Sequence, residues 1–329
     1  MLRLILTRLA YAVLVLIGVT FVVASMIKLI PGDPVDIMAA GNPGMTNEDM
    51  AKLREELGLT RPVLEQFLIY AKNALVGDLG ISIRQRTPAA DLILERLPAT
   101  AELSFWAIVI ALAIAIPIGI VTALKRDTIV DYAGTVVAVL GVSMPGFLLG
   151  ILLILFLSVT LRWLPASGFR GSALASIPRA IAAGDPSVFW NSFRYFILPA
   201  FSLAFVLIAI NARLVRSSMI EVLQQDYVTF ARAKGLPLRV VYLHHALRNA
   251  LLPVLTVVGL QLGSLLSGTI VIETVFAWPG IGRLAVQAVH WRDYPLIQAV
   301  VLISAMLFVV LNLVVDILYR VVDPRAKHG

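Results

Sequence analysis

Six long stretches of the chain carry no charged side chain, and they decide what it can fold into. These apolar runs span residues 9–27, 103–124, 132–161, 195–212, 249–272 and 294–315, and each is at least 18 residues long. About 20 apolar residues allow a helix to cross the hydrocarbon core of a bilayer. The chain is 14% charged, against roughly 25% in soluble domains. We therefore predict an all-α integral membrane protein with six transmembrane helices and exclude a water-soluble enzyme.

Cysteine and charge narrow the possibilities further. The chain has no cysteine, which excludes disulfides, zinc–thiolate sites and a cysteine nucleophile. Its net charge of +7 is typical either of nucleic-acid binding or of basic loops kept on the cytoplasmic side of a membrane. The distribution of the basic residues decides between these two interpretations.

The basic residues favour cytoplasmic ends for the chain. With both termini inside, 13 basic residues lie on the short cytoplasmic segments, which are the N-terminus, 125–131, 213–248 and the tail. Such enrichment is the positive-inside pattern. Four arginines in 162–194 oppose this topology, but the reverse topology would place the 213–248 cluster outside. Run 9–27 is too long for a signal peptide and lacks a small-residue cleavage site, so we expect a retained anchor.

The segment 31–100 is long enough to have a shape of its own. It contains a helix-like stretch, 47–57, with Thr46 or Asn47 as the capping residue, and several turn signals. Its apolar side chains predict a compact extracytoplasmic subdomain: Leu53, Leu57, Leu64, Phe67, Leu68 and Leu75. The predicted domains are an anchor plus subdomain (1–95), a five-helix core (96–322) with a cytoplasmic loop at 213–250, and a tail (323–329).

The cytoplasmic segment 213–253 is the most specific part of the chain. Residues 221–234 contain no glycine or proline and are expected to form a helix. Gly235 suits the position after a helix end because it tolerates positive φ, and Pro237 can open a second helix at about 238–249. A solvated basic loop beside anionic lipid is the simpler interpretation. The helix–glycine–helix pattern instead favours a helix that docks in a groove of a partner.

This segment resembles the EAA loop of binding-protein-dependent ABC importer permeases, of whose general motif Ala231, Gly235 and Leu247 match. The chain is more closely similar to the dipeptide and oligopeptide branch of that family (DppB/OppB-like permeases), over nearly its whole length. The resemblance is carried by residues 30–34, 78–82, 96–100, 143–147, 164–168, 226–235, 245–249, 273–282, 292–295 and 323–325.

The resemblance implies a type I ABC importer permease (MetI-like) fold that is not itself an enzyme. It implies a second homologous permease subunit, two cytoplasmic ATPase subunits that carry ATP and magnesium, a periplasmic solute-binding protein, and a bacterial cytoplasmic (inner) membrane as the location. No Gly-x-x-x-x-Gly-Lys-Ser/Thr segment occurs in the chain, so a phosphate-binding loop must come from another chain. The residues carried over as the ATPase-coupling loop are Asp226, Tyr227, Thr229, Ala231, Arg232, Ala233, Lys234, Gly235, His245, Arg248 and Asn249.

Polar and helix-breaking residues in the spans are the candidates for a pathway or gate. Glu102 and Glu273 lie at the outer ends of spans, where interface exposure or binding of a peptide's amino terminus would explain them. Prolines inside the spans indicate a kink or a gating hinge. Close helix packing explains the small polar stripe of the fifth span as well as a pathway does. The candidates are Pro145, Gln261, Ser264, Ser267 and Glu273; the four histidines are not spaced for a metal site.

Two other functions are weighed against the importer. A secondary transporter or channel driven by an ion gradient would predict ionisable residues and broken helices near the midplane, and the spans offer few such residues. A membrane enzyme is a third interpretation. For an importer, the substrate stays open among a dipeptide, an oligopeptide, a nickel chelate, glutathione, an opine and a sugar conjugate, because a separate binding protein selects it.

Overall fold

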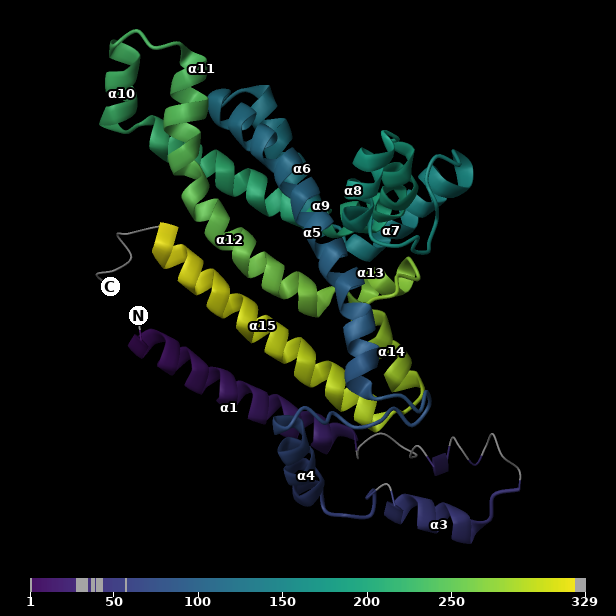
Figure 1. Cartoon of the computed structure of the whole chain (residues 1–329). Helices are drawn as coiled ribbons and strands as arrows, with labels where there is room; N and C mark the ends of the chain where they lie inside the picture. Colours follow the sequence, from purple (N-terminus) through teal and green to yellow (C-terminus); the bar gives the residue numbers. More distant parts are fainter. Residues whose placement is uncertain (1, 28–34, 37–38, 40–43, 57, 323–329) are drawn as a thin grey trace. The chain divides into compact units, whose positions relative to one another are not determined.

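A computed structural model describes residues 2–27, 35–36, 39, 44–56 and 58–322. Helices dominate this part of the chain, which contains no strand and a single isolated β-bridge between Ile81 and Pro88 (Figure 1). The all-α prediction is confirmed. The chain divides into two compact units. The first consists of Met1–Thr100 and Pro279–Val310, and the second consists of Ala101–Trp278 and Leu311–Gly329. The predicted domain limits did not include this pairing of the N-terminal part with 279–310. The predicted division into an anchor with a subdomain, a five-helix core and a tail stays a prediction.

The first unit contains helices from both ends of the sequence. They are α1 (Leu2–Ile27), α3 (Asn47–Glu56), α4 (Val63–Leu75), the start of α5 (Ala89–Leu124), α14 (Ile281–His290) and the start of α15 (Tyr294–Val322). Its core combines buried side chains such as Ile93, Leu284 and Leu296. Burial of such side chains is the main stabilising contribution, at roughly 1.5–3 kcal/mol each.

The segment predicted as a subdomain begins its first helix as expected. The amide of Asp49 donates to Thr46 Oγ1, and the amide and hydroxyl of Thr46 donate back to Asp49 Oδ2. Thr46 is therefore the N-cap of α3. These hydrogen bonds from Thr46 hold the pKa of the Asp49 carboxyl below its usual range, because they favour its charged form.

The described apolar side chains of that segment do not gather into a separate core. Phe67 is buried and its ring lies 5.5 Å from that of Phe21 on α1, edge to face. By contrast α3 buries no residue, Leu64, Leu68 and Leu75 are exposed, and Leu57 lies outside the described residues. Helix α4 is thus held through α1, since an amphipathic helix is stabilised mainly by the surface it packs against.

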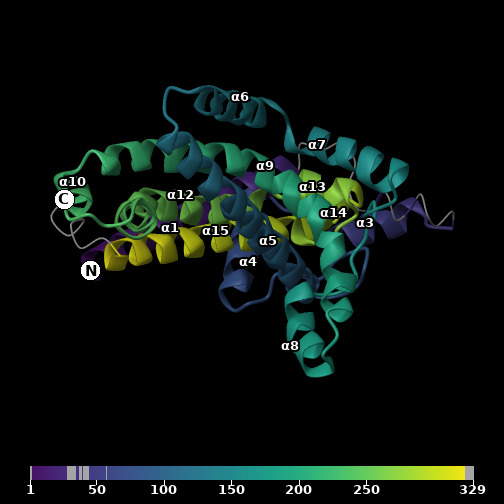
Figure 2. The same ribbon diagram turned by 90° about the horizontal axis from the view of Figure 1, so that it is seen from above.

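The second unit is built around the 37-residue helix α9 (Ser187–Leu223). Helices α6 (Ile129–Ser143), α7 (Gly146–Leu153), α8 (Ala173–Ala183) and α12 (Leu247–Gly268) all pack on α9, and α12 runs beside it in both views (Figures 1 and 2). The remaining elements are the π-helical segments η1 (Ile154–Thr160) and η2 (Val241–Ala246) and the short helices α10 (Asp226–Ala233), α11 (Leu238–Val240) and α13 (Ile270–Val275).

The candidate membrane spans agree with five of the six predicted runs. Among the described residues, four helices are long and apolar enough to cross a membrane, over Ala89–Leu124, Ser187–Leu223, Leu238–Leu265 and Tyr294–Val315. A bent pair, Ile129–Ser143 with Gly146–Thr160, makes a fifth if it is one span. The remaining run falls in α1, whose described apolar part is Val13–Ser25.

The third predicted span is not one straight helix. Helices α6 and α7 meet at 99°, and the break falls at Met144 and Pro145, both of which are extended. Proline disfavours helical backbone at the residue before it and has no amide hydrogen to donate. Pro199 shows the alternative outcome, because α9 continues through it without a break.

Candidate functional site

The segment predicted as the cytoplasmic loop, 213–250, is divided into helices differently from the sequence prediction. The predicted helix 221–234 is two helices: α9 runs on to Leu223, and α10 starts at Asp226 after the extended residue Gln225. No glycine or proline marks this break. It is a tertiary effect, since the turn lets α10 fold back against η2 and the end of α9.

The turn after α10 forms at the predicted glycine. Gly235 has φ +75°, its amide donates to the Arg232 carbonyl, and the Leu236 amide donates to the Ala231 carbonyl. This is the hydrogen-bond pattern with which glycine ends many helices. A helix resumes after Pro237, as predicted. The prediction that it is a separate helix over 238–249 is wrong, because α11, η2 and α12 form one candidate span over Leu238–Leu265.

One face of α10 is fixed to the spans. Val228 and Ala231 are buried against Val241, and at the N-terminal end of α10 Asn249 Nδ2 donates to the Tyr227 hydroxyl over 2.7 Å. Tyr227 and Asn249 were predicted site residues 22 positions apart, and the fold brings them together. Helix α10 is therefore attached directly to the start of α12.

The other face of α10 offers an aromatic and basic surface. Phe230 is 61% exposed, and Lys234 Nζ lies 4.7 Å from the centre of its ring. Arg232 Cζ lies 5.7 Å from the ring of Tyr242. Both are cation–π geometries. Of the other predicted loop residues, His245 is half-buried and the rest of that group are exposed, namely Asp226, Thr229, Ala233 and Arg248.

An ion pair that the sequence analysis missed joins α6 to α9 at the end nearest this loop. Arg216 donates from Nε to Asp131 Oδ1 over 2.5 Å and from Nη2 to Oδ2 over 2.6 Å. The Asp131 side chain is 5% exposed, and the Asp127 amide also donates to it. A bidentate guanidinium–carboxylate pair fixes both distance and orientation. The only sequence signal was the position of Asp131 directly before an apolar run.

The pathway candidates of the fifth span lie at a helix contact. Gln261 is buried, and its Oε1 accepts from Asn211 Nδ2 of α9 over 2.9 Å. Asn211 Oδ1 and Gln261 Nε2 have no hydrogen-bond partner among the described residues. Ser264 donates to the Gln261 carbonyl of its own helix, and the side chain of Ser267 lies outside the described residues.

The two glutamates predicted at outer ends of spans are both buried, so the expectation of simple interface exposure is wrong. Glu273 is fully buried and accepts from the Thr269 hydroxyl over 2.8 Å. Glu102 accepts from the Leu174 amide at the start of α8 over 2.7 Å. Glu273 is thereby bonded within its own turn, whereas Glu102 joins α5 to the start of α8; buried polar groups usually have such partners.

A further buried carboxylate joins two motifs of the first unit. Asp293 is fully buried and accepts from the Ser82 hydroxyl over 2.5 Å and from the amides of Ile83 and Arg84 over 3.2 Å. These contacts bring together the segments 78–82 and 292–295, which lie far apart in the sequence. No group of three or more His, Asp or Glu side chains in the described part of the chain is placed to hold a metal ion.

Comparison with known proteins identifies relatives over the whole chain. Residues 115–328 match the family of binding-protein-dependent transport system inner membrane components, and residues 1–104 match the N-terminal part of the same kind of protein. The chain is 42% identical to the dipeptide transport system permease protein DppB of Escherichia coli K12 over all of its length and 99% of that protein. It is 39% identical to the oligopeptide permease AppB of Bacillus subtilis, covering 98% of this chain and 99% of AppB. It is also 39% identical to the glutathione permease GsiC of Escherichia coli O6:H1, over the full length of both.

Proposed function

Because the chain belongs to the family of binding-protein-dependent transport system inner membrane components, we propose that it is a permease subunit of an ATP-driven importer of peptides or peptide-like solutes. The observation that carries this proposal is the identity of 42% to a dipeptide permease across the entire chain. The permeases for oligopeptides and glutathione are nearly as similar. All three carry peptides, which makes a peptide backbone the common feature of the proposed cargo.

The partners follow from the same proposal. A second homologous permease completes the pathway, two cytoplasmic ATPase subunits supply ATP and magnesium chemistry, and a periplasmic solute-binding protein delivers the cargo. The chain itself hydrolyses nothing and binds no cofactor or nucleic acid, and membrane lipid surrounds it. Both termini and α10 face the cytoplasm of a bacterial cell, where the basic residues of 213–248 favour them.

Helix α10 is proposed as the point where ATPase movement enters the spans. Its exposed face offers Phe230 and Lys234 to a groove on the ATPase, in the way amphipathic helices dock in grooves. Its other face packs through Val228 and Ala231 on η2, while the Asn249–Tyr227 hydrogen bond ties it to α12. A displacement of α10 by the ATPase would therefore move α9 and α12 together, as a rigid-body switch.

The pathway residues are proposed at the α9–α12 contact and the α6–α7 break. Gln261, with Ser264 and Ser267 on the same helix, would line the pathway when α9 and α12 separate. Pro145 would act as the hinge of the 99° bend. Glu273 would hold the outer end of this region through Thr269.

The coupling role of α10 is tested by replacing Gly235 with valine. A β-branched residue at φ +75° costs about 1–2 kcal/mol of backbone strain, and this disturbs the end of α10. We expect ATPase association and transport-coupled ATP hydrolysis to fall by roughly 5–30-fold, with membrane insertion intact. Binding is measured by co-purification of the ATPase subunits with the permease pair, and hydrolysis in proteoliposomes.

Gly184 provides a matched control. It has φ +63° at the end of α8 and, like Gly235, has open space where a Cβ would lie. Gly184→Val therefore introduces the same strain far from the loop and should leave ATPase binding unchanged. Normal coupling in Gly235→Val, or equal losses in both variants, would refute the role of α10. Solute uptake by the chain in liposomes without ATPase subunits would refute the importer itself.

A further inference from the structure

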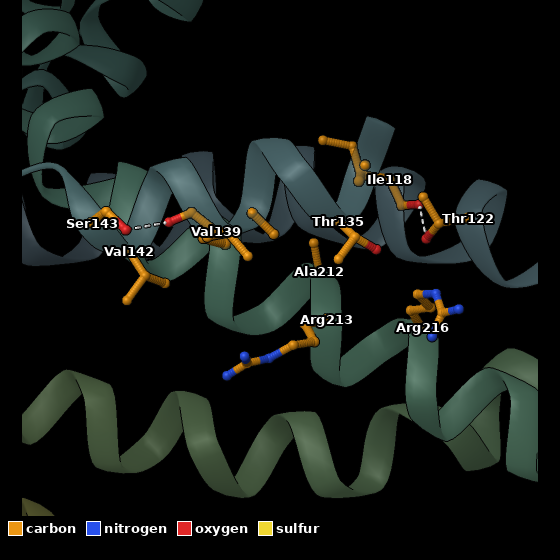
Figure 3. A pocket seen from close by; sticks show the side chains of 12 residues that line it. Ile118, Thr122, Thr135, Val139, Val142, Ser143, Ala212, Arg213 and Arg216 are labelled. Atoms are coloured by element: carbon orange, nitrogen blue, oxygen red, sulfur yellow. Dashed lines mark hydrogen bonds between the residues drawn. The ribbon is translucent and has the colours of Figure 1, made fainter. Parts of the chain in front are cut away.

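A cavity of about 310 Å³ lies between α5, α6 and α9 of the second unit (Figure 3). Its volume falls at the lower end of the roughly 300–1,000 Å³ typical of small-molecule sites. Ile118, Val139 and Val142 give it apolar walls, and Arg213 and Arg216 are its charged residues.

The walls of the cavity are held at fixed distances by close helix contacts. A Cβ built on Gly141 of α6 would lie 2.9 Å from the Cβ of Ala209 on α9, and one on Gly134 would lie 2.5 Å from Thr122 Cγ2 on α5. Both separations are shorter than ordinary side-chain contacts. The cavity is therefore bounded by backbones that approach closely, as small residues allow in membrane proteins.

The two arginines that line the cavity differ in their partners. Arg216 is committed to Asp131. Arg213 is exposed and makes no hydrogen bond or ion pair within the described residues. In Figure 3 its side chain runs along α9 in the direction opposite to Arg216. The cavity thus holds one uncommitted positive charge.

The depth of Arg213 argues that this part of the cavity contains water. Arg216 pairs with Asp131 at the start of α6, and Ala209 meets Gly141 near its end. Arg213 lies three residues from Arg216 along α9, about 4.5 Å along the axis, and its side chain extends further in the same direction. A guanidinium facing hydrocarbon costs free energy, up to roughly 2.5–3.5 kcal/mol at the centre of a span, and such residues in membrane proteins mark water-filled cavities and substrate pathways.

We propose that Arg213 binds the carboxylate of the transported solute within the pathway, which rests on the proposed function in peptide import. Every linear peptide with a free C-terminus carries a carboxylate, and the planar guanidinium fork matches its two oxygens. The hydroxyls of Thr135 and Ser143 donate to carbonyls of their own helix, so their oxygens are left to accept from a peptide N–H. The site recognises the end of the peptide and not its side chains.

The absence of cysteine from the chain gives a test that needs no transport. Ser143→Cys places a single thiol in the cavity of the full-length chain, co-expressed with its partner subunits and studied in open membrane fragments. A negatively charged, membrane-impermeant methanethiosulfonate should react faster than its positively charged counterpart. Arg213→Gln should reduce this preference by about fivefold or more, because two charges a few ångströms apart in a partly hydrated site interact by about 1 kcal/mol or more. Arg213→Lys should retain most of it.

Two controls separate the site from general effects. Ile129→Cys lies at the exposed start of α6, outside the cavity lining, and Arg213→Gln should leave its charge preference unchanged. Millimolar trialanine should slow labelling of Ser143→Cys more than trialanine amide does, and Arg213→Gln should abolish that difference. Equal protection by the two peptides, or a preference unaffected by Arg213→Gln, would overturn the proposal.

A lipid-filled cavity is a distinct outcome that also overturns the proposal. In that case both charged reagents would fail to react with Ser143→Cys while neutral N-ethylmaleimide reacts. If the protein is not an ATP-driven importer, the chain would take up solute without ATPase subunits. That result would leave the labelling ratios of Ser143→Cys unaffected. The two hypotheses can therefore fail separately.

Discussion

At the residue scale, the buried carboxylates of the described residues each accept hydrogen bonds from specific donors. Both carboxylate oxygens of Asp131 accept hydrogen bonds from Arg216, and one also accepts from the Asp127 amide. The Asp293 carboxylate accepts from a hydroxyl and from backbone amides. A carboxylate removed from water is stable only with such partners. Each of these residues therefore fixes the distance between two segments far apart in sequence.

Breaking the Asp131–Arg216 pair should destabilise the second unit. Asp131→Ala leaves a guanidinium that is 28% exposed without its partner, at a cost of about 3 kcal/mol, the low end for a broken buried pair. Thermal unfolding of the purified protein in detergent measures the loss. The double variant Asp131→Asn with Arg216→Gln keeps hydrogen-bonding groups without charge and should recover more than half of it. Strictly additive losses would show that the two side chains do not interact.

At the scale of the element, α10 has two faces of different character. Its Val228 side is a packing surface, and on its other side Phe230 is exposed beside Lys234. An exposed aromatic residue beside a cation is typical of the central residues of protein interfaces.

Phe230→Ala should therefore weaken ATPase binding by about 2 kcal/mol, as loss of an aromatic interface anchor does, without changing the thermal stability of the permease. Trp163→Ala is a suitable control, because Trp163 is 71% exposed in a segment predicted to lie outside the cell. Titration of the ATPase subunits onto the solubilised permease measures both variants. A stability loss in Phe230→Ala that matches its loss of binding would place Phe230 in the fold and not in the interface.

At the scale of the whole molecule, the topology makes a direct prediction. Lys234→Cys should react with an impermeant maleimide only after cells are permeabilised, whereas Lys72→Cys and Arg179→Cys should react in intact cells. All three positions are exposed, and the chain has no other thiol. Labelling of Lys234→Cys in intact cells would reverse the proposed orientation.

The sequence alone determined the elements that depend on local chemistry. Charge-free runs identify spans because the bilayer demands about 20 apolar residues and internal backbone hydrogen bonding. Thr46 and Gly235 were predicted at helix ends because each supplies a local geometry, a side-chain acceptor in one case and tolerance of positive φ in the other. The family was also visible in the sequence, since its motifs are spread over the whole chain.

Only the tertiary structure decided what depends on packing. The break at Gln225, the continuity of the second loop helix with α12, and the burial of Glu102 and Glu273 have no local signal. The partners of Asp131, Asp293 and Gln261 lie between 50 and 211 positions away. Sequence pattern reports the period and the ends of a helix, but which helices meet is set by side-chain shapes and charges summed over distant segments. For that reason the loop could be placed from the sequence, whereas the uncommitted arginine in the cavity could not.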